Sequence, residues 1–393
     1  MPRDIPPWVG RAFPNRNGAR RSVVGFMLVG SAMLRAILPF AAAFVVVGLV
    51  ACGHDGTLIP DQGRLEAPPP GQGFQMTTGD FPVDPGTEEQ DCYFLKVRDL
   101  AAKGGLNPDE PVYLHRTQIA YKPGSHHMNI FRVRTIHDLD PANGPIQRSI
   151  NGASPCSKSA NWADWPLVAN LQQAGAFDWT YPDGVANKLD PDETLMLQTH
   201  YVNATTQKTP EGGHVDVNFW AIPANEVKFQ MGTLFATKQS IRICASNPKP
   251  TFEGTCQFNS GQGVQIIGAN GHFHSRGKEF QMFDWDGLTV ARPPEDKKFY
   301  TSLAWNEPPM MRSPDLDMSV PTKGGVWYTC NYEWTPPPPE VGCDTLNALD
   351  KKLFNTPDDK LDCCYTFGNT VDRAEHCNVF VYYYPKQDDV NCF

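Results

Sequence analysis

The sequence has few basic residues and no apolar run of the ~20 residues that a membrane span needs, and both shortages exclude classes of protein. Lys and Arg total 34 against 43 Asp and Glu, so the net charge is -9 over 393 residues. With no basic patch to neutralise phosphates, nucleic acid is excluded as a partner. Long helical patterns are scarce and no segment repeats at a fixed period, which argues against a helical or repeat protein.

Proline (36 residues), glycine (33) and aromatic residues (11%) are plentiful instead. Short strand-like segments follow one another between turn residues, which predicts an all-β fold of antiparallel sandwich type. A chain of 393 residues suits two domains of roughly 150 residues each. With a boundary near Pro223–Glu226, we expect one domain over residues 81–224 and a second over residues 225–393.

The N-terminal residues are typical of a targeting segment. Arg20, Arg21 and Arg35 precede an apolar run from Ala36 to Val50. The run has about 15 residues where a membrane span needs ~20, so a cleaved signal is favoured over a transmembrane anchor. Its end, LVAC, is similar to a bacterial lipobox, which predicts cleavage before Cys52 and lipidation of its thiol.

These features divide the N-terminal part in two. Residues 1–52 are predicted to be a lipoprotein signal peptide. Residues 53–80 are rich in Gly, Pro and Gln and are predicted to be a flexible tether. The expected location is therefore a bacterial cell envelope, with the protein anchored to a membrane and facing the periplasm or the outer surface.

The cysteines fit an exported protein. Without Cys52, ten remain, and an even number in an exported chain predicts up to five disulfides. The alternative is thiolate metal ligands, and the absence of any CxxC pair argues against it. The ten are Cys92, Cys156, Cys244, Cys256, Cys330, Cys343, Cys363, Cys364, Cys377 and Cys392.

Histidine is rare but clustered. The chain has 10 histidines, and six of them lie in four strand-like segments: YKPGSHHMNIFR, LQTHY, GHFHSRG and EHCNVFVYYY. The six are His126, His127, His200, His272, His274 and His376.

The HFH segment has the simplest geometry. Side chains alternate along a strand, so His272 and His274 share a face while Phe273 points to the other side. Residues at i and i+2 lie roughly 6–7 Å apart at the backbone, a gap that two imidazoles can close onto one ion. The alternative is two unrelated surface histidines.

Adjacent His126 and His127 would point to opposite faces of a regular strand. A shared ion therefore needs a bulge, which Gly124 could permit, or ligation through Nδ1 of one ring and Nε2 of the other. Otherwise one ring is buried and the other exposed. His200 follows a buried-looking run and, taken alone, is as consistent with a core histidine.

The combination is more informative than any single segment. Two pairs of histidines, each joined by one distant histidine, fall in separate halves of the chain. This number of ligands predicts two sites with three imidazoles each. Imidazole suits copper or zinc, and copper has the higher intrinsic affinity.

The same segments resemble the copper type II monooxygenases, the family that includes peptidylglycine α-hydroxylating and dopamine β-monooxygenases. HHMNIF is similar to the family's HHMxxF pattern and GHFHSRG to its HxHxxG pattern. The stretches YPDGV, LMLQTHY, GGVWYTC and EHCNVFVYYY also keep the family's order. The resemblance covers about residues 110–385 and implies two jelly-roll β-sandwiches packed side by side.

The resemblance implies roles for the histidines. His126, His127 and His200 would hold the copper that supplies electrons. His272, His274 and His376 would hold the catalytic copper that binds dioxygen, with His376 where the family has a methionine. That replacement puts a harder donor in place of a soft thioether.

It also implies substrate and disulfide residues. Asn270 stands where the peptide-processing members have an arginine, and Phe380 where they have a tyrosine, so a glycine-extended peptide is an unlikely substrate. Asn378 and Tyr382 complete the expected substrate-binding set, which would suit a more apolar or aromatic molecule. Cys330 would pair with Cys377 and Cys256 with Cys392.

The predicted function is therefore a copper-dependent monooxygenase, with two copper ions per chain. It would hydroxylate a C–H bond of a small molecule, using dioxygen and an external reductant such as ascorbate. One alternative is a non-catalytic lipoprotein that stores or transfers copper. Another is a zinc hydrolase with a three-histidine site and Glu375 as its general base.

Overall fold

The computed structural model describes residues 63–158, 164–173, 176–203 and 212–392. The predicted signal peptide and Cys52, the predicted lipidation site, lie outside these residues. Among the residues described, no helix combines the length and apolar character needed to cross a membrane.

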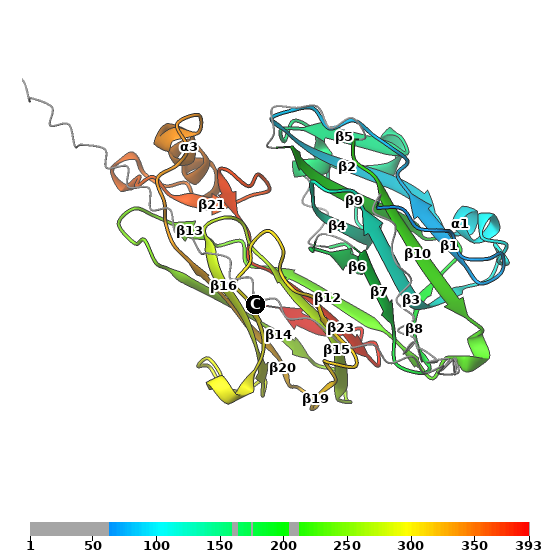
Figure 1. Cartoon of the computed structure of the whole chain (residues 1–393). Coiled ribbons are helices and arrows are strands. Elements are labelled where there is room, and N and C mark those ends of the chain that lie inside the picture. Colours follow the sequence, from blue (N-terminus) through cyan, green and yellow to red (C-terminus); the bar gives the residue numbers. More distant parts are fainter. Residues whose placement is uncertain (1–62, 159–163, 174–175, 204–211, 393) are drawn as a thin grey trace, which may run out of the picture. The chain divides into compact units, whose positions relative to one another are not determined.

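The first part of the chain forms two sheets (Figure 1). One six-stranded sheet has the order β1-β10-β3-β8-β11, with β7 also pairing β3. Its strands are β1 (Gly73–Thr77), β3 (Val112–Tyr121), β7 (Ala176–Thr180), β8 (Val185–Leu189), β10 (Val215–Ile222) and β11 (Phe229–Gln230). The five-stranded sheet β5-β2-β9-β4-β6, called the β9 sheet below, carries the first three candidate histidines. Its strands are β2 (Thr87–Lys96), β4 (Ser125–Arg132), β5 (Ile146–Ile150), β6 (Leu167–Leu171) and β9 (Thr194–Asn203).

The later part of the chain forms three sheets. The β15 sheet contains β12 (Gly232–Thr237), β15 (Val264–His272), β18 (Met311–Arg312), β19 (Met318–Val320) and β23 (Asn378–Tyr384). A second five-stranded sheet contains β14 (Thr251–Phe258), β16 (Gly277–Trp285), β17 (Lys298–Ser302), β20 (Gly325–Tyr332) and β24 (Val390–Cys392). A three-stranded sheet contains β13 (Arg242–Ile243), β21 (Tyr365–Phe367) and β22 (Ala374–Glu375).

The all-β prediction holds, but the prediction of two antiparallel jelly-roll sandwiches is wrong. The strands divide among five small sheets, one of them with three strands, and the β8–β11 and β21–β22 pairs are parallel. Sequence patterning indicates where a strand lies and which face it buries. It does not say which of many short strands will pair, because several orders satisfy the same alternation.

Strand β1 also corrects the predicted tether. It lies within residues 53–80, yet it pairs along its length with β10, from Gly73 opposite Trp220 to Thr77 opposite Asp216. Phe74 and Met76 are buried in the hydrophobic core. The tether prediction is therefore wrong for these residues, because Phe74 and Met76 alternate with polar neighbours as a half-buried strand requires.

Alternation along the strands separates two buried faces of the β9 sheet. Met128 and Ile130 of β4 and Leu197 of β9 belong to the hydrophobic core. The residues that alternate with them along the strands, including His127 and Gln198, lie on the other face.

The β15 sheet is built the same way. Val379, Val381 and Tyr383 of β23 belong to a second core. The residues that alternate with them include Phe380 and Tyr382, which pack with the first core instead. The second face of the β15 sheet therefore contacts the part of the chain that contains the β9 sheet.

Five disulfides join all ten remaining cysteines. Cys330–Cys377 and Cys256–Cys392 are formed as the resemblance implied. The other pairs are Cys92–Cys156, Cys244–Cys364 and Cys343–Cys363. So many disulfides fit a protein of an oxidising compartment outside the cytosol.

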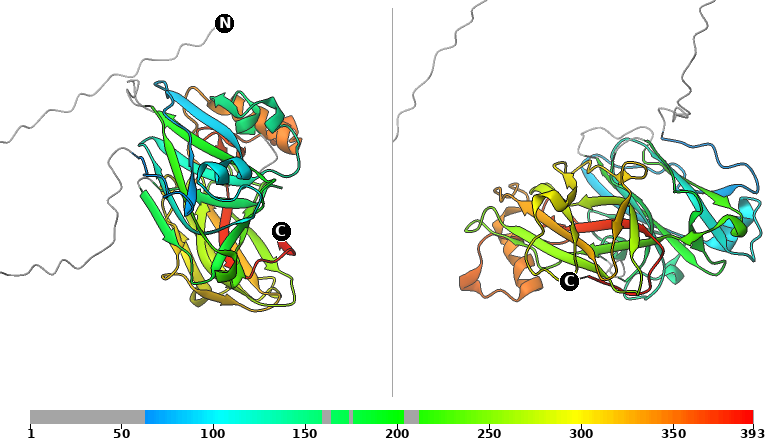
Figure 2. Two further views of the ribbon diagram at one scale, coloured as in Figure 1. Left: turned by 90° about the vertical axis from the view of Figure 1, so that its right-hand side faces the viewer. Right: turned by 90° about the horizontal axis from the view of Figure 1, so that it is seen from below.

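Helices are few among the described residues. Helix α1 (Val97–Lys103) follows β2, α2 (Pro155–Lys158) carries Cys156, and α3 (Gly342–Phe354) lies against β21 (Figures 1 and 2, α3 in orange). Short 3-10 turns span Pro141–Asn143, Ala224–Glu226, Glu295–Lys297 and Asp358–Lys360.

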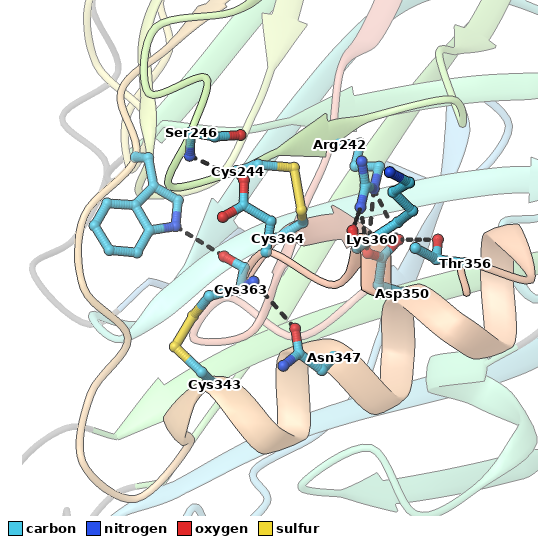
Figure 3. Close-up of a disulfide and its surroundings, with 12 residues drawn as sticks. Arg242, Cys244, Ser246, Cys343, Asn347, Asp350, Thr356, Lys360, Cys363 and Cys364 are labelled. Carbon is cyan, nitrogen blue, oxygen red and sulfur yellow. Dashed lines mark hydrogen bonds and ion pairs between the residues drawn. A yellow bond between two sulfur atoms is a disulfide. The ribbon is translucent and has the colours of Figure 1, made fainter. Parts of the chain in front are cut away.

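Helix α3 is fastened by covalent and ionic contacts (Figure 3). Cys343 in its first turn is bonded to Cys363, and buried Asp350 accepts hydrogen bonds from Arg242. Cys244, Asp362 and Cys364 lie close enough to hold an ion. Both of these cysteines are already joined to each other in a disulfide, so this group is not a thiolate metal site.

Candidate metal centre

A β-bulge in β4 brings the adjacent histidines to one side. Ser125 pairs with Tyr201 and His127 with His200, so His126 is an extra residue between two successive pairs. The bulge removes the strict alternation that would separate neighbouring side chains. Gly124, which precedes the strand, has a positive φ of 96°, as the sequence argument anticipated.

The result is a compact group of three histidines. The ring centroids of His126 lie 5.1 Å from those of both His127 and His200, and the His127 and His200 centroids are 4.7 Å apart. One nitrogen from each ring lies within 4.8 Å of the others, a spacing that could hold a metal ion.

The other three histidines come from the end of β15 and from the link before β23. His272 ends β15, where it pairs with Asn378, and His274 lies in the turn beyond. Phe273, between them, is fully buried in the second core. His376 lies beside them, with its ring centroid 4.4 Å from that of His274 and 5.6 Å from that of His272.

The six histidines lie together rather than at two separate places. The ring centroid of His126 is 5.2 Å from that of His272 and 6.0 Å from that of His274. The second set of close nitrogens comes from His126, His272 and His274. His376 was predicted as the third member of this set, and His126 is found instead. All six are buried, with exposures from 0% to 8%.

Hydrogen bonds fix which nitrogen of three rings carries its proton. His200 Nε2 donates to Glu88 at 2.7 Å, His274 Nδ1 donates to the Ala374 carbonyl at 2.9 Å, and His376 Nε2 donates to Asn369 at 3.1 Å. The opposite nitrogens of His274 and His376 then have their lone pairs available for a metal, whereas His200 Nδ1 lies 3.1 Å from His127 Nε2, at hydrogen-bond distance. Contacts of this kind orient metal-binding histidines in proteins.

The nitrogens left over have no partner in the part of the chain that is described. They are His126 Nε2, both nitrogens of His272, His274 Nε2 and His376 Nδ1. Buried polar atoms without partners are rare and costly, at roughly 1–3 kcal/mol each. Because these atoms converge in one place, a bound metal would satisfy them, and the residues present fit such a group.

Burial also keeps five of the six rings neutral. It is the largest cause that lowers the pKa of His126, His127, His272 and His376 well below 6.5, and the neighbouring histidines add to it. The pKa of His274 falls to about 4, mainly through burial. Neutral imidazole is the form that binds a metal.

This lowering of the histidine pKa values predicts acid sensitivity of the metal-free protein. The unfolded chain binds protons below about pH 6.5, while folded His274 stays neutral down to about pH 4. The contribution of these histidines to stability is therefore fully present above pH 6.5 and is lost as pH decreases toward 4. His274 alone contributes about 3 kcal/mol over that range. Urea unfolding at pH 7.5 and at pH 5 should show the loss. His274→Gln should make the loss of unfolding free energy between pH 7.5 and pH 5 smaller. An unchanged loss in this variant would contradict the role of His274.

Two acidic residues support the cluster, and sequence reasoning missed the part that both play. Glu88 lies on β2 and accepts from His200. Burial is the largest effect and raises its pKa, but the hydrogen bond from His200 and smaller Coulombic effects of nearby side chains together outweigh it and leave the pKa lowered. Glu375 accepts from the backbone N–H groups of His274 and Arg276 at 2.9 and 2.8 Å, so it holds the turn after β15. Glu88 could not be recognised from the sequence, because 112 residues separate it from His200. The pairing of β2 with β9 brings the two residues together.

Removing the Glu88 carboxylate should weaken metal binding. We expect Glu88→Ala to lower copper affinity roughly 10–100-fold, because His200 loses the acceptor that fixes its proton. Competition with a chelator measures the change. Glu89→Ala is the matched control, since Glu89 is the next residue of the same strand and pairs with Arg148 on the other face. Equal losses in both variants would contradict a specific role for Glu88.

The predicted substrate residues form part of the contact between the two sheets. Tyr382 donates to the Asn170 side chain at 2.5 Å, and Asn170 donates to Asn270 at 3.2 Å. Phe380 stacks on Phe235 with centroids 5.0 Å apart. Asn270 Nδ2 and Asn378 Oδ1 are buried without partners among the described residues, and both lie on the face that carries His272.

Comparison with known proteins adds little. No protein-family model matches the chain, and no curated protein matches it. Among solved structures, the chain is similar to the cowpea mosaic virus top component, a naturally occurring empty particle, at 7% identity and a TM-score of 0.27. That match covers 84% of this chain and 94% of the viral chain. A likeness this distant carries no inference about function.

Proposed function

We propose that the protein is a copper-dependent monooxygenase that hydroxylates a C–H bond of a small molecule. The observation that carries the proposal is the convergence of six buried imidazoles, four of which have nitrogens without a partner among the described residues. Imidazole ligands and the absence of thiolates suit copper, which binds such sites more tightly than zinc. Bound copper would supply one-electron redox chemistry and the activation of dioxygen.

The overall reaction consumes one dioxygen and one substrate, R–H, with two electrons and two protons from an external reductant such as ascorbate. The products are R–OH and water. The chain itself orients the ligands: Glu88, Asn369 and the Ala374 carbonyl hold three rings in one tautomer. Burial of the cluster keeps bulk water away from the reactive centre.

Two buried amides favour a substrate with neutral hydrogen-bonding groups. Asn270 Nδ2 is a donor and Asn378 Oδ1 an acceptor, and both lack partners among the described residues. Asn270 lies two residues before His272, on the same face of the β15 sheet. The aromatic rings of Phe380 and Tyr382 complete this face, in keeping with the apolar or aromatic substrate expected from the sequence.

A non-catalytic role in copper storage or transfer is the second candidate. His376 in place of the methionine of the resembled family is the observation that favours it, because a third imidazole stabilises Cu(II) more than a thioether does. A zinc hydrolase is less well supported. Both carboxylate oxygens of Glu375, its expected base, already accept backbone hydrogen bonds.

Metal analysis and oxygen uptake test the proposal together. The purified chain should bind two copper ions and consume dioxygen when a reductant and a substrate are supplied. Two bound coppers without uptake, over a panel of reductants and small aromatic substrates, would favour storage. Zinc as the main metal in protein purified from its own host would overturn the copper assignment.

We propose that the protein is located in the cell envelope. The disulfides fit an exported protein. We propose that lipid on Cys52 anchors it to a membrane, from the sequence that precedes this residue. Mass spectrometry of the N-terminal peptide from the native protein tests this, and an unmodified Cys52 would contradict it.

Restoring the family's methionine should tune reactivity. His376→Met would replace the unpartnered Nδ1 with a thioether, a softer donor that favours Cu(I). We expect the reduction potential of the bound copper to rise and oxygen uptake to increase several-fold. Redox titration and an oxygen electrode measure the two effects. An unchanged potential would show that residue 376 is not a ligand.

A further inference from the structure

We infer that Arg276 is a positioning residue whose buried positive charge raises the reduction potential of a copper ion bound at His274. This inference rests on the proposed function for the identity of the metal. It goes further, because it names a residue that sets the redox property of one site. The pattern HxHxxG leaves residue 276 open, so the resemblance assigns no role to this arginine.

Arg276 is buried among neutral partners. It lies two residues after His274, and only 6% of it is exposed. Its Nη1 donates to Ser275 Oγ at 2.6 Å and to the Val371 carbonyl at 2.9 Å, and its Nη2 donates to the Tyr365 hydroxyl at 3.0 Å. Among the described residues, no carboxylate forms an ion pair with this guanidinium, and its Nε has no partner. The charge is therefore held by hydrogen bonds and is not cancelled by direct contact with an acid.

A buried charge without an ion pair is costly to the fold. A guanidinium cannot avoid this cost by losing its proton, because it stays protonated at any pH at which proteins fold. The ring of Tyr365 offsets part of the cost, since Cζ of Arg276 lies 4.1 Å from the ring centroid. Departures of this kind from the usual rules of packing are expected at functional sites. A charge kept beside candidate metal ligands indicates an electrostatic role there.

Hydrogen bonds fix the position of Arg276 relative to the histidines. Glu375, which precedes His376, accepts from the backbone N–H groups of His274 and Arg276 at 2.9 and 2.8 Å. The Arg276 side chain in turn donates to the Val371 carbonyl, in the link that leads to His376. The segments that carry His274 and His376 are thus tied to each other, with their ring centroids 4.4 Å apart.

A fixed positive charge favours the metal ion of lower charge. Cu(II) carries one more positive charge than Cu(I), so repulsion from Arg276 destabilises the oxidised ion more and raises the reduction potential. The effect is strong in a buried site, because charges are screened less there than in water. The charge reaches His274 itself: burial is the main cause that lowers the pKa of this ring, and Arg276 is one of the smaller causes.

This role opposes the effect of His376. A third imidazole stabilises Cu(II) more than the thioether of the resembled family does, which lowers the reduction potential. The charge of Arg276 acts in the opposite direction, from the residue pair that follows His274 in the sequence. Arg276 thus keeps this copper reducible by an external reductant such as ascorbate, although the soft ligand is missing.

Redox titration of the copper-loaded full chain tests the inference, with the Cu(II) signal followed by EPR. Arg276→Gln removes the charge and keeps a polar side chain. In this variant we expect the ratio of Cu(I) to Cu(II) affinity to fall roughly tenfold for one bound copper, which lowers its potential by about 59 mV. The other copper should keep its potential. Two unchanged potentials would overturn the inference.

A second variant tests the same charge if Arg276→Gln does not fold. Ser275→Asp leaves Arg276 in place and puts a carboxylate where the Ser275 hydroxyl accepts from Nη1. We expect the potential to fall in this variant also, because the new carboxylate offsets the guanidinium. A potential equal to that of the parent would count against the inference in the same way.

Arg312→Gln is the matched control. Cζ of Arg312 lies 4.8 Å from the ring centroid of Phe177, so this guanidinium also stacks on an aromatic ring. Among the described residues, no hydrogen bond joins its side chain to the link before His376. We expect both potentials to stay within twofold of the parent in affinity ratio. A shift as large as that in Arg276→Gln would overturn the specific role of Arg276.

The outcomes separate this inference from the proposed function. A lowered potential in Arg276→Gln, together with a parent that consumes no dioxygen, would support the inference and count against the monooxygenase. Oxygen uptake by the parent with unchanged potentials in the variants would do the reverse. A parent that binds no copper would overturn both.

Discussion

Replacing His272 with alanine is expected to lower reductant-dependent oxygen uptake by more than about 100-fold. The side chain ends β15 in the middle of the cluster, and neither of its nitrogens has a partner among the described residues. Changes to residues that merely support a ligand already cost roughly 10–100-fold. Loss of a ligand at the centre should cost more. Bound copper should fall from two ions to one, as elemental analysis would show.

Stability of the metal-free protein gives the control for that experiment. In the absence of copper, His272 buries two unsatisfied nitrogens, so His272→Ala removes a penalty of roughly 1–3 kcal/mol per group while it leaves a small cavity. These effects oppose each other, and we expect a thermal midpoint within a few degrees of the parent. The parent should gain stability on adding copper, and the variant should gain less. A variant that is inactive because it is unfolded would show no thermal transition. Full retention of both coppers would contradict the role of His272 as a ligand.

The candidate ligands were open to sequence reasoning because their chemistry is local. Adjacent His126 and His127 are recognisable as a pair, and the bulge that unites them was anticipated from Gly124. His272 and His274 share a face by simple alternation along a strand. Each of these inferences needs no more than a few neighbouring residues.

What required the structure is the relation between distant strands. Sequence patterning does not determine that the β9 and β15 sheets meet through Asn170 and Tyr382, because that contact joins residues 212 positions apart. For this reason two separate sites were expected, and His126 rather than His376 completes the second close set. The division into five small sheets could not be predicted for the same reason, because the order in which strands pair depends on side-chain packing over the whole chain.

Supporting residues were also hidden by distance. Glu88 is an ordinary acidic residue in a strand that looks half exposed, and its role appears because β2 pairs with β9, which places it near His200. Asn369 lies in a loop with no motif, seven residues before His376. Residues of this kind contribute one hydrogen bond each, which leaves no periodic signal in the sequence.

The second large effect should follow from removing the Cys330–Cys377 disulfide. The bond ties β20 to the residue that follows His376 and closes a separation of 47 residues. Loss of that constraint lowers the free energy of unfolding by about 4 kcal/mol in the chain-entropy estimate. Cys330→Ala with Cys377→Ala should therefore be much less stable to urea than the parent, measured without reductant.

A matched disulfide separates stability from metal binding. Cys256–Cys392 joins β14 to the terminal strand β24 and closes 136 residues, which predicts a comparable loss of about 5 kcal/mol when both cysteines become alanine. That pair does not neighbour a cluster histidine in sequence, whereas Cys377 follows His376 directly. We expect the Cys256/Cys392 variant to keep two coppers under conditions where it is folded, and the Cys330/Cys377 variant to bind the second ion more weakly, because His376 is held less firmly. Equal copper affinity in the two folded variants would show that the disulfide stabilises the fold without positioning the metal ligand.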